Sequence, residues 1–309
     1  MLLLRAGCEG IVGSGWARAT TGPPREWLKF KTALRPLYVA RPRRTGAVPR
    51  MFEKLATAER VQVAKQKTER LVDHMLDLLA LHESNAVVFY SDTLALQIPR
   101  SYAAHAFHLF QECMFRSEIV RLCALWDRPY PDLSREGIPT IIALIDNAEV
   151  IAALVDESHA SWTGVSPVDP SEVEETDVAV RELLGRLANE RAIEEAVKAR
   201  DGLTNSITQA RKIESSTILR SARNLRDKHL AHSLSETSQE KEGAVLPMKY
   251  GDERKLLLDS IPLVQALHLW VNGKGFNFDH SREIARRNAE ELWKNCTFNI
   301  PRRDERRND

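Results

Sequence analysis

Residues 223–232 read Arg-Asn-Leu-Arg-Asp-Lys-His-Leu-Ala-His and close a long amphipathic pattern that begins near Leu203. At about 100° per residue, one face of this helix carries Ile207, Ile218, Ala222 and Leu225. His229 and His232 continue that face, and Arg226 lies about 60° from His229. The pattern predicts one helix from Leu203 to His232, with two imidazoles facing a core or a partner helix and a guanidinium at the edge of that face.

The rest of the chain from residue 51 to 300 shows the apolar spacing of amphipathic helices between short breaks. The helices expected from this spacing cover 52–81, 101–126, 134–157, 172–200, 203–232, 252–270 and 280–296. Segment 87–98 is expected to connect the first two helices, with room for a helical turn, and the polar segment 235–243 is expected to form an exposed loop. No convincing alternating strand pattern occurs. The sequence therefore predicts an all-α protein, an antiparallel bundle of five to seven helices.

The expected helix ends depend on proline, glycine and capping residues. Two prolines in the segment 128–131 stop the second helix, and Ser134 is positioned to cap the third. Ser171–Glu174 has capping-box spacing before the fourth helix. Asp201-Gly202 is expected to end that helix, and Pro262 to kink the helix over 252–270.

Residues 1–50 differ in character from the remainder. They hold ten basic and two acidic residues, a net charge of +8, whereas the remainder holds 34 basic and 41 acidic residues, a net charge of −7. An Arg-rich, acid-poor start resembles a transit peptide, but the interpretation adopted is a disordered or non-native extension, with Met51 as the natural start. We therefore expect an extension over 1–50, a helical domain over 51–300 and a charged tail over 301–309.

Bulk charge and cysteine usage limit the possible partners and compartment. A net charge of −7 beyond residue 50 does not indicate a nucleic-acid partner, so RNA binding would need a local basic patch. Cys113 and Cys123 lie in a helical apolar pattern and are expected to be buried free thiols, which suits a reducing cytoplasm. No apolar run reaches the roughly 18–20 residues that cross a bilayer, so no membrane partner is expected.

Three motifs with possible chemistry have simpler structural explanations. His229-x-x-His232 could supply two zinc ligands, but no third ligand is close in sequence, so no metal or cofactor is expected. Asp127 and Asp132 are expected to cap and solvate a turn. Gly273-x-Gly275 lacks the strand and the third glycine of a dinucleotide site. The arginine–histidine cluster itself can be a salt-bridged helix end, because cations are favourable there.

A family resemblance adds to this interpretation. Arg223-Asn224-x4-His229 and Arg226-Asp227-x4-His232 both fit the R-polar-x4-H pattern of HEPN domains, in overlapping frames. Together with 117–122 and Trp126-Asp127-Arg128-Pro129, residues 226–232 resemble the AbiU-type HEPN family of abortive-infection proteins. The resemblance covers about 51–298. It implies a helical bundle that forms a homodimer and places two motif helices across a cleft.

The resemblance also implies a metal-independent endoribonuclease in phage defence or a toxin–antitoxin system. The candidate catalytic residues are Arg226, Asp227 and His232 in one frame and Arg223, Asn224 and His229 in the other. Histidine can move protons at the 2′-hydroxyl and the phosphate of RNA, arginine can hold the phosphate, and Asp or Asn can orient both. The resemblance favours Arg226 with His232, and the other frame stays open.

A second function remains open alongside the nuclease. Family members include non-catalytic RNA-binding modules and protein-interaction modules, so the partner could be RNA, a second copy, or an antitoxin or toxin protein. The net charge of −7 favours this alternative, because RNA-binding surfaces are usually basic. A basic patch of Arg220, Arg223, Arg226 and Lys228 that is open to solvent in a cleft would favour the nuclease.

Overall fold

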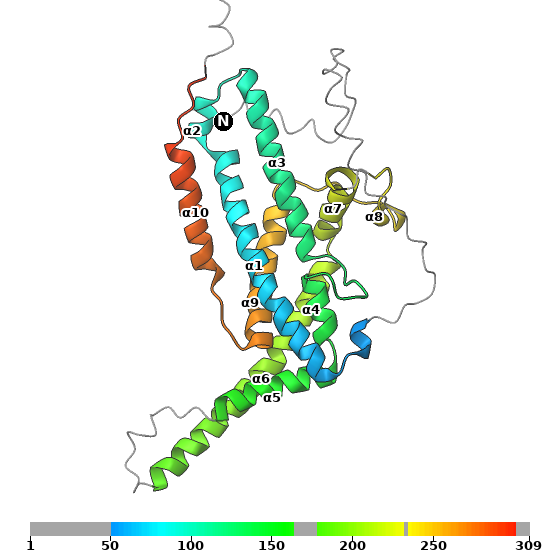
Figure 1. Ribbon diagram of the computed structural model, residues 1–309, viewed down its shortest axis with the longest axis vertical. Helices are drawn as coiled ribbons and strands as arrows, with labels where there is room; N and C mark the ends of the chain where they lie inside the picture. The colour runs from blue at the N-terminus through cyan, green and yellow to red at the C-terminus, as the bar shows by residue number, and fades with distance from the viewer. Residues whose placement is uncertain (1–50, 164–177, 232–233, 301–309) are drawn as a thin grey trace, which may run out of the picture. The chain divides into compact units, whose positions relative to one another are not determined.

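A computed structural model describes residues 51–163, 178–231 and 234–300, all within the compact unit 50–309 (Figure 1). Every regular element in the described residues is a helix and none is a strand, which confirms the all-α bundle. The described residues form ten α-helices rather than five to seven, because the expected third helix is divided and two short helices occupy expected connections.

Helix α1 (Thr57–Tyr90) contacts five other helices of the bundle and follows the short 3-10 helix η3 (Met51–Lys54). It packs against α3, α4, α5, α9 and α10, whose bounds follow below. No glycine or proline interrupts it, so the helix continues past residue 81, where we expected it to end. The expected connector is therefore shorter, because residues 87–90 belong to α1, and it contains the short helix α2 (Asp92–Gln97), capped by the Ser91 hydroxyl.

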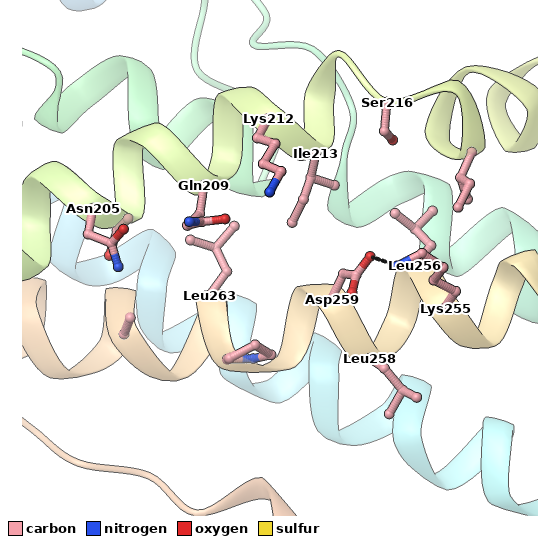
Figure 2. A pocket seen from close by; sticks show the side chains of 14 residues that line it. Asn205, Gln209, Lys212, Ile213, Ser216, Lys255, Leu256, Leu258, Asp259 and Leu263 are labelled. Carbon is pink, nitrogen blue, oxygen red and sulfur yellow. Dashed lines mark hydrogen bonds and ion pairs between the residues drawn. The ribbon is translucent and has the colours of Figure 1, made fainter.

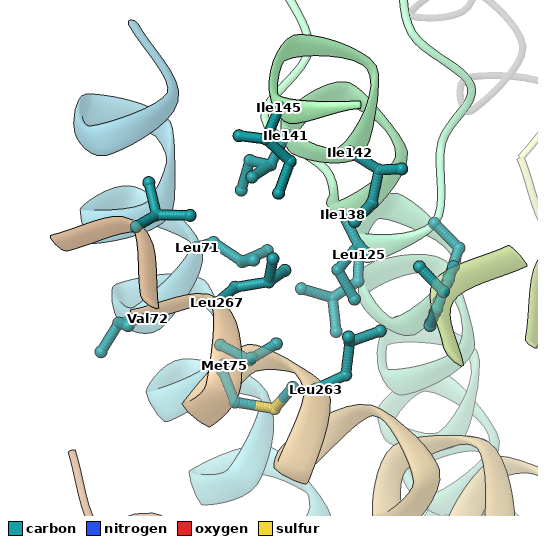
Figure 3. Packing of buried hydrophobic residues seen from close by; sticks show 14 of the residues in the cluster. Leu71, Val72, Met75, Leu125, Ile138, Ile141, Ile142, Ile145, Leu263 and Leu267 are labelled. Carbon is teal, nitrogen blue, oxygen red and sulfur yellow. The ribbon is translucent and has the colours of Figure 1, made fainter. Parts of the chain in front are cut away.

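The core lies where α1 meets α3 (Tyr102–Leu125), α4 (Ile138–Ile145) and α9 (Asp252–Asn272). Figure 3 shows the apolar side chains that these helices direct toward one another, including Leu71, Met75, Leu125, Ile138, Ile141 and Leu267. Each such side chain stabilises the fold by roughly 1.5–3 kcal/mol when fully buried. Trp126, at the C-cap of α3, is fully buried, and its Nε1 donates to Ser260 Oγ on α9 over 3.0 Å.

The expected third helix is two helices. α4 ends at Ile145, and α5 (Ala148–Thr163) leaves it at an angle of 91°. Asn147 makes the break, since its Oδ1 accepts hydrogen bonds from the backbone N–H groups of Glu149 and Val150 and so starts a new helix. The cap of α4 is Gly137 and not Ser134. A Cβ at Gly137 would lie 2.8 Å from the carbonyl oxygen of Leu125, so only glycine fits there.

The chain from 178 to 230 also divides differently from expectation. α6 (Val178–Glu214) runs through Asp201-Gly202, and α7 (Thr217–Leu225) begins after a break at Ser215-Ser216. The predicted helix from Leu203 to His232 is therefore wrong. Gly202 serves close packing instead of termination, because a Cβ there would lie 2.2 Å from Nε1 of Trp270 on α9.

The last third of the described chain holds three helices. α8 (Ser238–Lys241) lies within the segment expected to be an exposed loop, and the Thr237 side chain that caps it is fully buried. α9 runs through Pro262 and ends at Gly273, whose positive φ of 69° suits the expected turn. α10 (Phe278–Asn295) packs along α1. The Ser171–Glu174 capping box and the 301–309 tail lie outside the described residues.

Two thiols on α3 differ in exposure. Cys123 is buried as expected, but Cys113 is exposed, because it lies on the opposite side of α3 from the core. In the described ranges no single helix combines the length and apolarity that a bilayer span requires. Of these helices, only the bent pair of α4 and α5, taken together, reaches that length and apolarity.

Candidate functional site

The arginine–histidine motif that begins at Arg223 lies on α7 and on a π-helical turn, η5 (Arg226–Leu230), that follows α7 directly. The Ser216 hydroxyl accepts a hydrogen bond from the backbone N–H of Leu219 and so starts α7. Leu219 and Ala222 are fully buried on its inner face. This packing fixes the direction in which the two motif arginines leave the helix.

Arg223 points into the protein. Its side chain is only 6% exposed, and its Nη2 donates to the carbonyl oxygen of Trp126 at the end of α3. Burial lowers the pKa of Arg223, since removal from water disfavours the charged form. A guanidinium held in this way supports the junction of α7 with α3 and is not presented to a ligand.

Arg226 lies at the surface of the same junction and is held by two carboxylates. Its Nε donates to Asp227 Oδ1 over 2.8 Å, and its Nη1 donates to Asp127 Oδ1 over 2.7 Å. Burial alone would lower the pKa of Arg226, but these two hydrogen bonds raise it above its ordinary value. The side chain is 16% exposed, so the charged group is oriented and still reachable from solvent.

Asp127 joins the site from a segment 99 residues earlier in the chain. It directly follows Trp126, whose buried ring fixes the end of α3. Its second oxygen lies 3.6 Å from Nη1 of Arg135, and that guanidinium lies 5.0 Å from the centre of the Tyr130 ring. The expectation that Asp127 merely solvates a turn is therefore wrong. Asp132 does cap a turn, accepting from the Ser134 N–H over 3.0 Å.

The π-helical turn changes the direction of the residues after Arg226. The N–H of Ala231 donates to the carbonyl oxygen of Arg226 over 2.8 Å, five residues back. A wheel drawn at 100° per residue no longer applies beyond this point, and His229 is exposed instead of continuing an apolar face. His232 lies outside the described residues. Single π-helical turns are frequent at functional sites.

Three of the four residues that could form a basic patch at this motif are bonded to groups within the protein. Arg220 donates through Nη2 to the carbonyl oxygens of Gln239 and Gly243, at 2.8 and 3.1 Å. Lys228 Nζ lies 2.6 Å from Glu240 Oε1. Because Arg223 is buried as well, only Arg226 among the four presents a charge that is not covered by the segment around α8.

The nearby thiol of Cys123 does not take part in chemistry. The side chain is fully buried, and burial raises its pKa to about 12. A thiol with this pKa remains protonated near neutral pH, so it is neither a nucleophile nor a metal ligand. Its place is in the packing beneath Arg223 and Arg226.

Two grooves lie elsewhere on the described chain. One, of about 580 Å³, separates α6 from α9, and Figure 2 shows Gln209 and Lys212 of α6 facing Leu263 and Asp259 of α9 across it. The other, of about 520 Å³, lies between α1 and α3 and includes His74. Neither groove is lined by the motif residues. No group of three or more His, Cys, Asp or Glu side chains in the described residues is arranged to hold a metal ion.

Comparison with known families assigns most of the helical part of the chain. The model of the AbiU2 family of HEPN domains matches residues 64–292. The chain belongs to the AbiU2 HEPN family. No curated protein and no solved structure matches this chain.

The match to AbiU2 spans both overlapping frames, and the geometry separates them. Arg226 and Asp227 are brought together with each other and with Asp127, whereas Arg223 is buried and Asn224 bonds to the segment around α8.

Sequence reasoning missed two participants in this AbiU2 site, Asp127 and Glu240. The stretch 126–129 was noted as part of the resemblance, but nothing in its spacing identified Arg226 as its partner.

Proposed function

We propose that this AbiU2 protein is a metal-independent endoribonuclease of abortive infection or of a toxin–antitoxin system, with a site built on Arg226, Asp227 and His232. The observation that carries the proposal is the fixed, partly exposed Arg226, which is held by Asp127 and Asp227 in the π-helical turn. Membership of the family supports it, because the resemblance implies this reaction for the Arg226 frame. Such an enzyme would act on RNA in the cytoplasm.

The proposed reaction uses the ribose itself as nucleophile. A histidine removes the proton from the 2′-hydroxyl, whose oxygen attacks the adjacent phosphorus, and the bond from phosphorus to O5′ breaks. A protonated group returns a proton to O5′, which leaves a 2′,3′-cyclic phosphate and a free 5′-hydroxyl. Arg226 stabilises the negative charge that develops on the phosphate oxygens. DNA is not a substrate, because it lacks the 2′-hydroxyl.

The role of the two carboxylates is to position Arg226. A guanidinium with two of its donors fixed loses less conformational freedom when a third group binds. Among the described residues, Nη2 of Arg226 makes no hydrogen bond, so both of its N–H groups are available to a phosphate oxygen. Asp127 is therefore a positioning residue in this proposal.

The active form proposed is a homodimer, as the family resemblance implies. A single chain supplies one Arg226 and one His232, and a second copy would place another set across a cleft. A group of large exposed apolar side chains supports an association with a partner surface, because exposed apolar patches mark interaction sites. On α6 these are Val180, Leu183, Leu187, Ile193 and Val197.

A second candidate function is a non-catalytic module that binds RNA or a protein partner, such as an antitoxin or toxin. The observation that favours it is the engagement of Arg220, Arg223 and Lys228 within the protein, which leaves little basic surface at the motif. Copurification of a stoichiometric protein partner, with no RNA cleavage by the purified complex, would support this candidate.

The deciding experiment is an RNA cleavage assay in EDTA with the wild type and the variants Arg226→Ala, His232→Ala and His229→Ala. We expect the first two variants to lose at least about 100-fold in rate, the usual contribution of a general acid–base group or a charge-stabilising donor. Arg116→Ala is the matched control, because Arg116 is an exposed arginine whose ion pair is to Glu112 on α3. A requirement for added metal, or equal activity in all variants, would contradict the proposal.

A further inference from the structure

An acidic side chain lies against the motif helix from the segment that covers it. Glu240 Oε1 is 2.6 Å from Lys228 Nζ and 3.4 Å from Asn224 Nδ2. Its other oxygen accepts the backbone N–H of Thr237 over 3.0 Å in the capping box of α8. The hydrogen bond from Lys228 is the main reason that the pKa of Glu240 lies below its ordinary value. A carboxylate is thus held as an anion by an ammonium and a carboxamide of the motif helix.

The segment 237–243, called the strap here, is attached to this helix at every fourth residue. Arg220 binds its backbone at Gln239 and Gly243, and the amide oxygen of Asn224 accepts from the Thr237 hydroxyl. The side chains at positions 220, 224 and 228 all contact this strap, so they lie on one side of α7 and η5. Arg226 contacts Asp127 at the end of α3 instead, so its side chain leaves this helix, which is about 10–12 Å wide, on a different side.

The groups around the Glu240 carboxylate are those that contact nucleic-acid backbones. Lysine, asparagine and backbone N–H groups are among the groups that contact phosphate oxygens in protein–nucleic acid complexes. Lys228 and Glu240 have side chains that are 33% and 23% exposed, so an anion from solvent can reach and replace the carboxylate. A phosphodiester carries the same single negative charge, and its exchange for Glu240 would leave Lys228 paired.

We propose that Asn224 and Lys228 form a phosphodiester subsite for a nucleotide that flanks the cleaved one, and that Glu240 occupies this subsite until a strand displaces it. The inference rests on the proposed function for its setting, since the strand is then RNA. The width of the helix separates the subsite from Arg226, so the two groups hold different phosphates of one strand. Because Glu240 competes for the subsite, a strand that cannot also bind Arg226 is bound more weakly.

The test is the binding of a fluorescent single-stranded DNA oligonucleotide, which contains phosphodiesters but cannot be cleaved, over a series of salt concentrations. Glu240→Gln keeps the capping box, because glutamine accepts the same hydrogen bond, and removes the competing charge. We expect binding roughly twofold to fivefold tighter, as for the release of one partly exposed ion pair. Lys228→Met in the Glu240→Gln background should abolish the gain and lower the salt slope by about 0.7.

The matched control is Glu242→Gln, which makes the same charge change in the strap, at an exposed residue 3.9 Å from Arg128. Equal gains from Glu240→Gln and Glu242→Gln would overturn the subsite, as would the absence of binding in every variant. RNA cleavage is measured on the same proteins. Tighter DNA binding by Glu240→Gln without RNA cleavage would retain the subsite and refute the nuclease. RNA cleavage, together with a change in DNA binding no larger for Glu240→Gln than for Glu242→Gln, would retain the nuclease and refute the subsite.

Discussion

Two arginines three positions apart have different tasks because their surroundings differ. Arg223 gives its hydrogen bond to a backbone carbonyl in the interior, whereas Arg226 gives two to carboxylates near the surface. A sequence pattern treats both as members of an R-polar-x4-H frame. The contacts favour the frame that begins at Arg226. If Arg223 left the interior to bind a ligand, the buried carbonyl oxygen of Trp126 would lose its hydrogen-bond donor.

This difference predicts separate effects on stability. Arg223→Ala should lower the free energy of unfolding by about 1–3 kcal/mol, because the buried carbonyl of Trp126 loses its donor. Arg116→Ala, which removes only an exposed i,i+4 pair with Glu112, should cost about 0.5 kcal/mol or less. Urea unfolding followed by circular dichroism measures both. Equal midpoints for the two variants would show that Arg223 is not fixed as described.

A buried carboxyl predicts the pH dependence of stability. Burial raises the pKa of Glu253, which lies near Glu118 and His82 at the start of α9. The folded state then holds this proton more tightly than the unfolded state, so the stabilisation is present below the unfolded value of 4.5 and is lost as pH rises through the folded pKa. Glu253→Gln should remove this part of the pH dependence of the urea midpoint. An unchanged profile would contradict it.

At the scale of helices, one glycine shows why a boundary was mispredicted. Asp201-Gly202 looks like a helix end, yet α6 continues through it, since Gly202 faces the ring of Trp270. The division at Asn147 was missed for a related reason, because a short polar pair inside an apolar stretch gives little periodic signal. Helix type and the buried faces follow from spacing along the chain, but ends that depend on contacts between helices do not.

Gly202 and Gly185 of the same helix form a matched pair for a test of this packing. Alanine is favoured over glycine in helices by about 1 kcal/mol, and nothing lies within 4 Å of a Cβ at Gly185, so Gly185→Ala should stabilise the protein. Gly202→Ala should destabilise it by about 1–3 kcal/mol, because its Cβ would lie 2.2 Å from the Trp270 ring. Urea midpoints measure both changes. Stabilisation by Gly202→Ala would show that α6 and α9 can separate without cost.

The candidate site was predictable only in part for the same physical reason. The motif residues are consecutive, so a pattern finds Arg226 and Asp227. Their partner Asp127 is 99 residues away from Arg226, and only the packing of α3 against η5 brings it near. A helical wheel assumes a regular α-helix and so cannot show the π-helical turn, which is why the sequence predicted His229 on a buried face.

For the whole molecule, the compact unit that begins near residue 50 predicts an independent domain. The core is built from residues between Phe52 and Phe278. A chain of residues 51–300 should therefore keep the helical far-UV spectrum of the full chain. Its free energy of unfolding in urea should lie within about 0.5 kcal/mol of that of the full chain, since surface changes away from the core cost little. Loss of helical signal or of a cooperative transition in the shorter chain would contradict this domain boundary.

The proposed homodimer predicts how mixtures of chains behave. If each site needs residues from two chains, excess Arg226→Ala protein should draw the wild type into mixed dimers and lower its rate of RNA cleavage. A wild-type chain with an independent site would keep its rate. Light scattering at micromolar concentration should give twice the chain mass of 35.0 kDa. Arg116→Ala protein in equal excess is the control, and it should form mixed dimers without loss. A monomeric mass together with a cleavage rate unaffected by excess Arg226→Ala would refute the shared site.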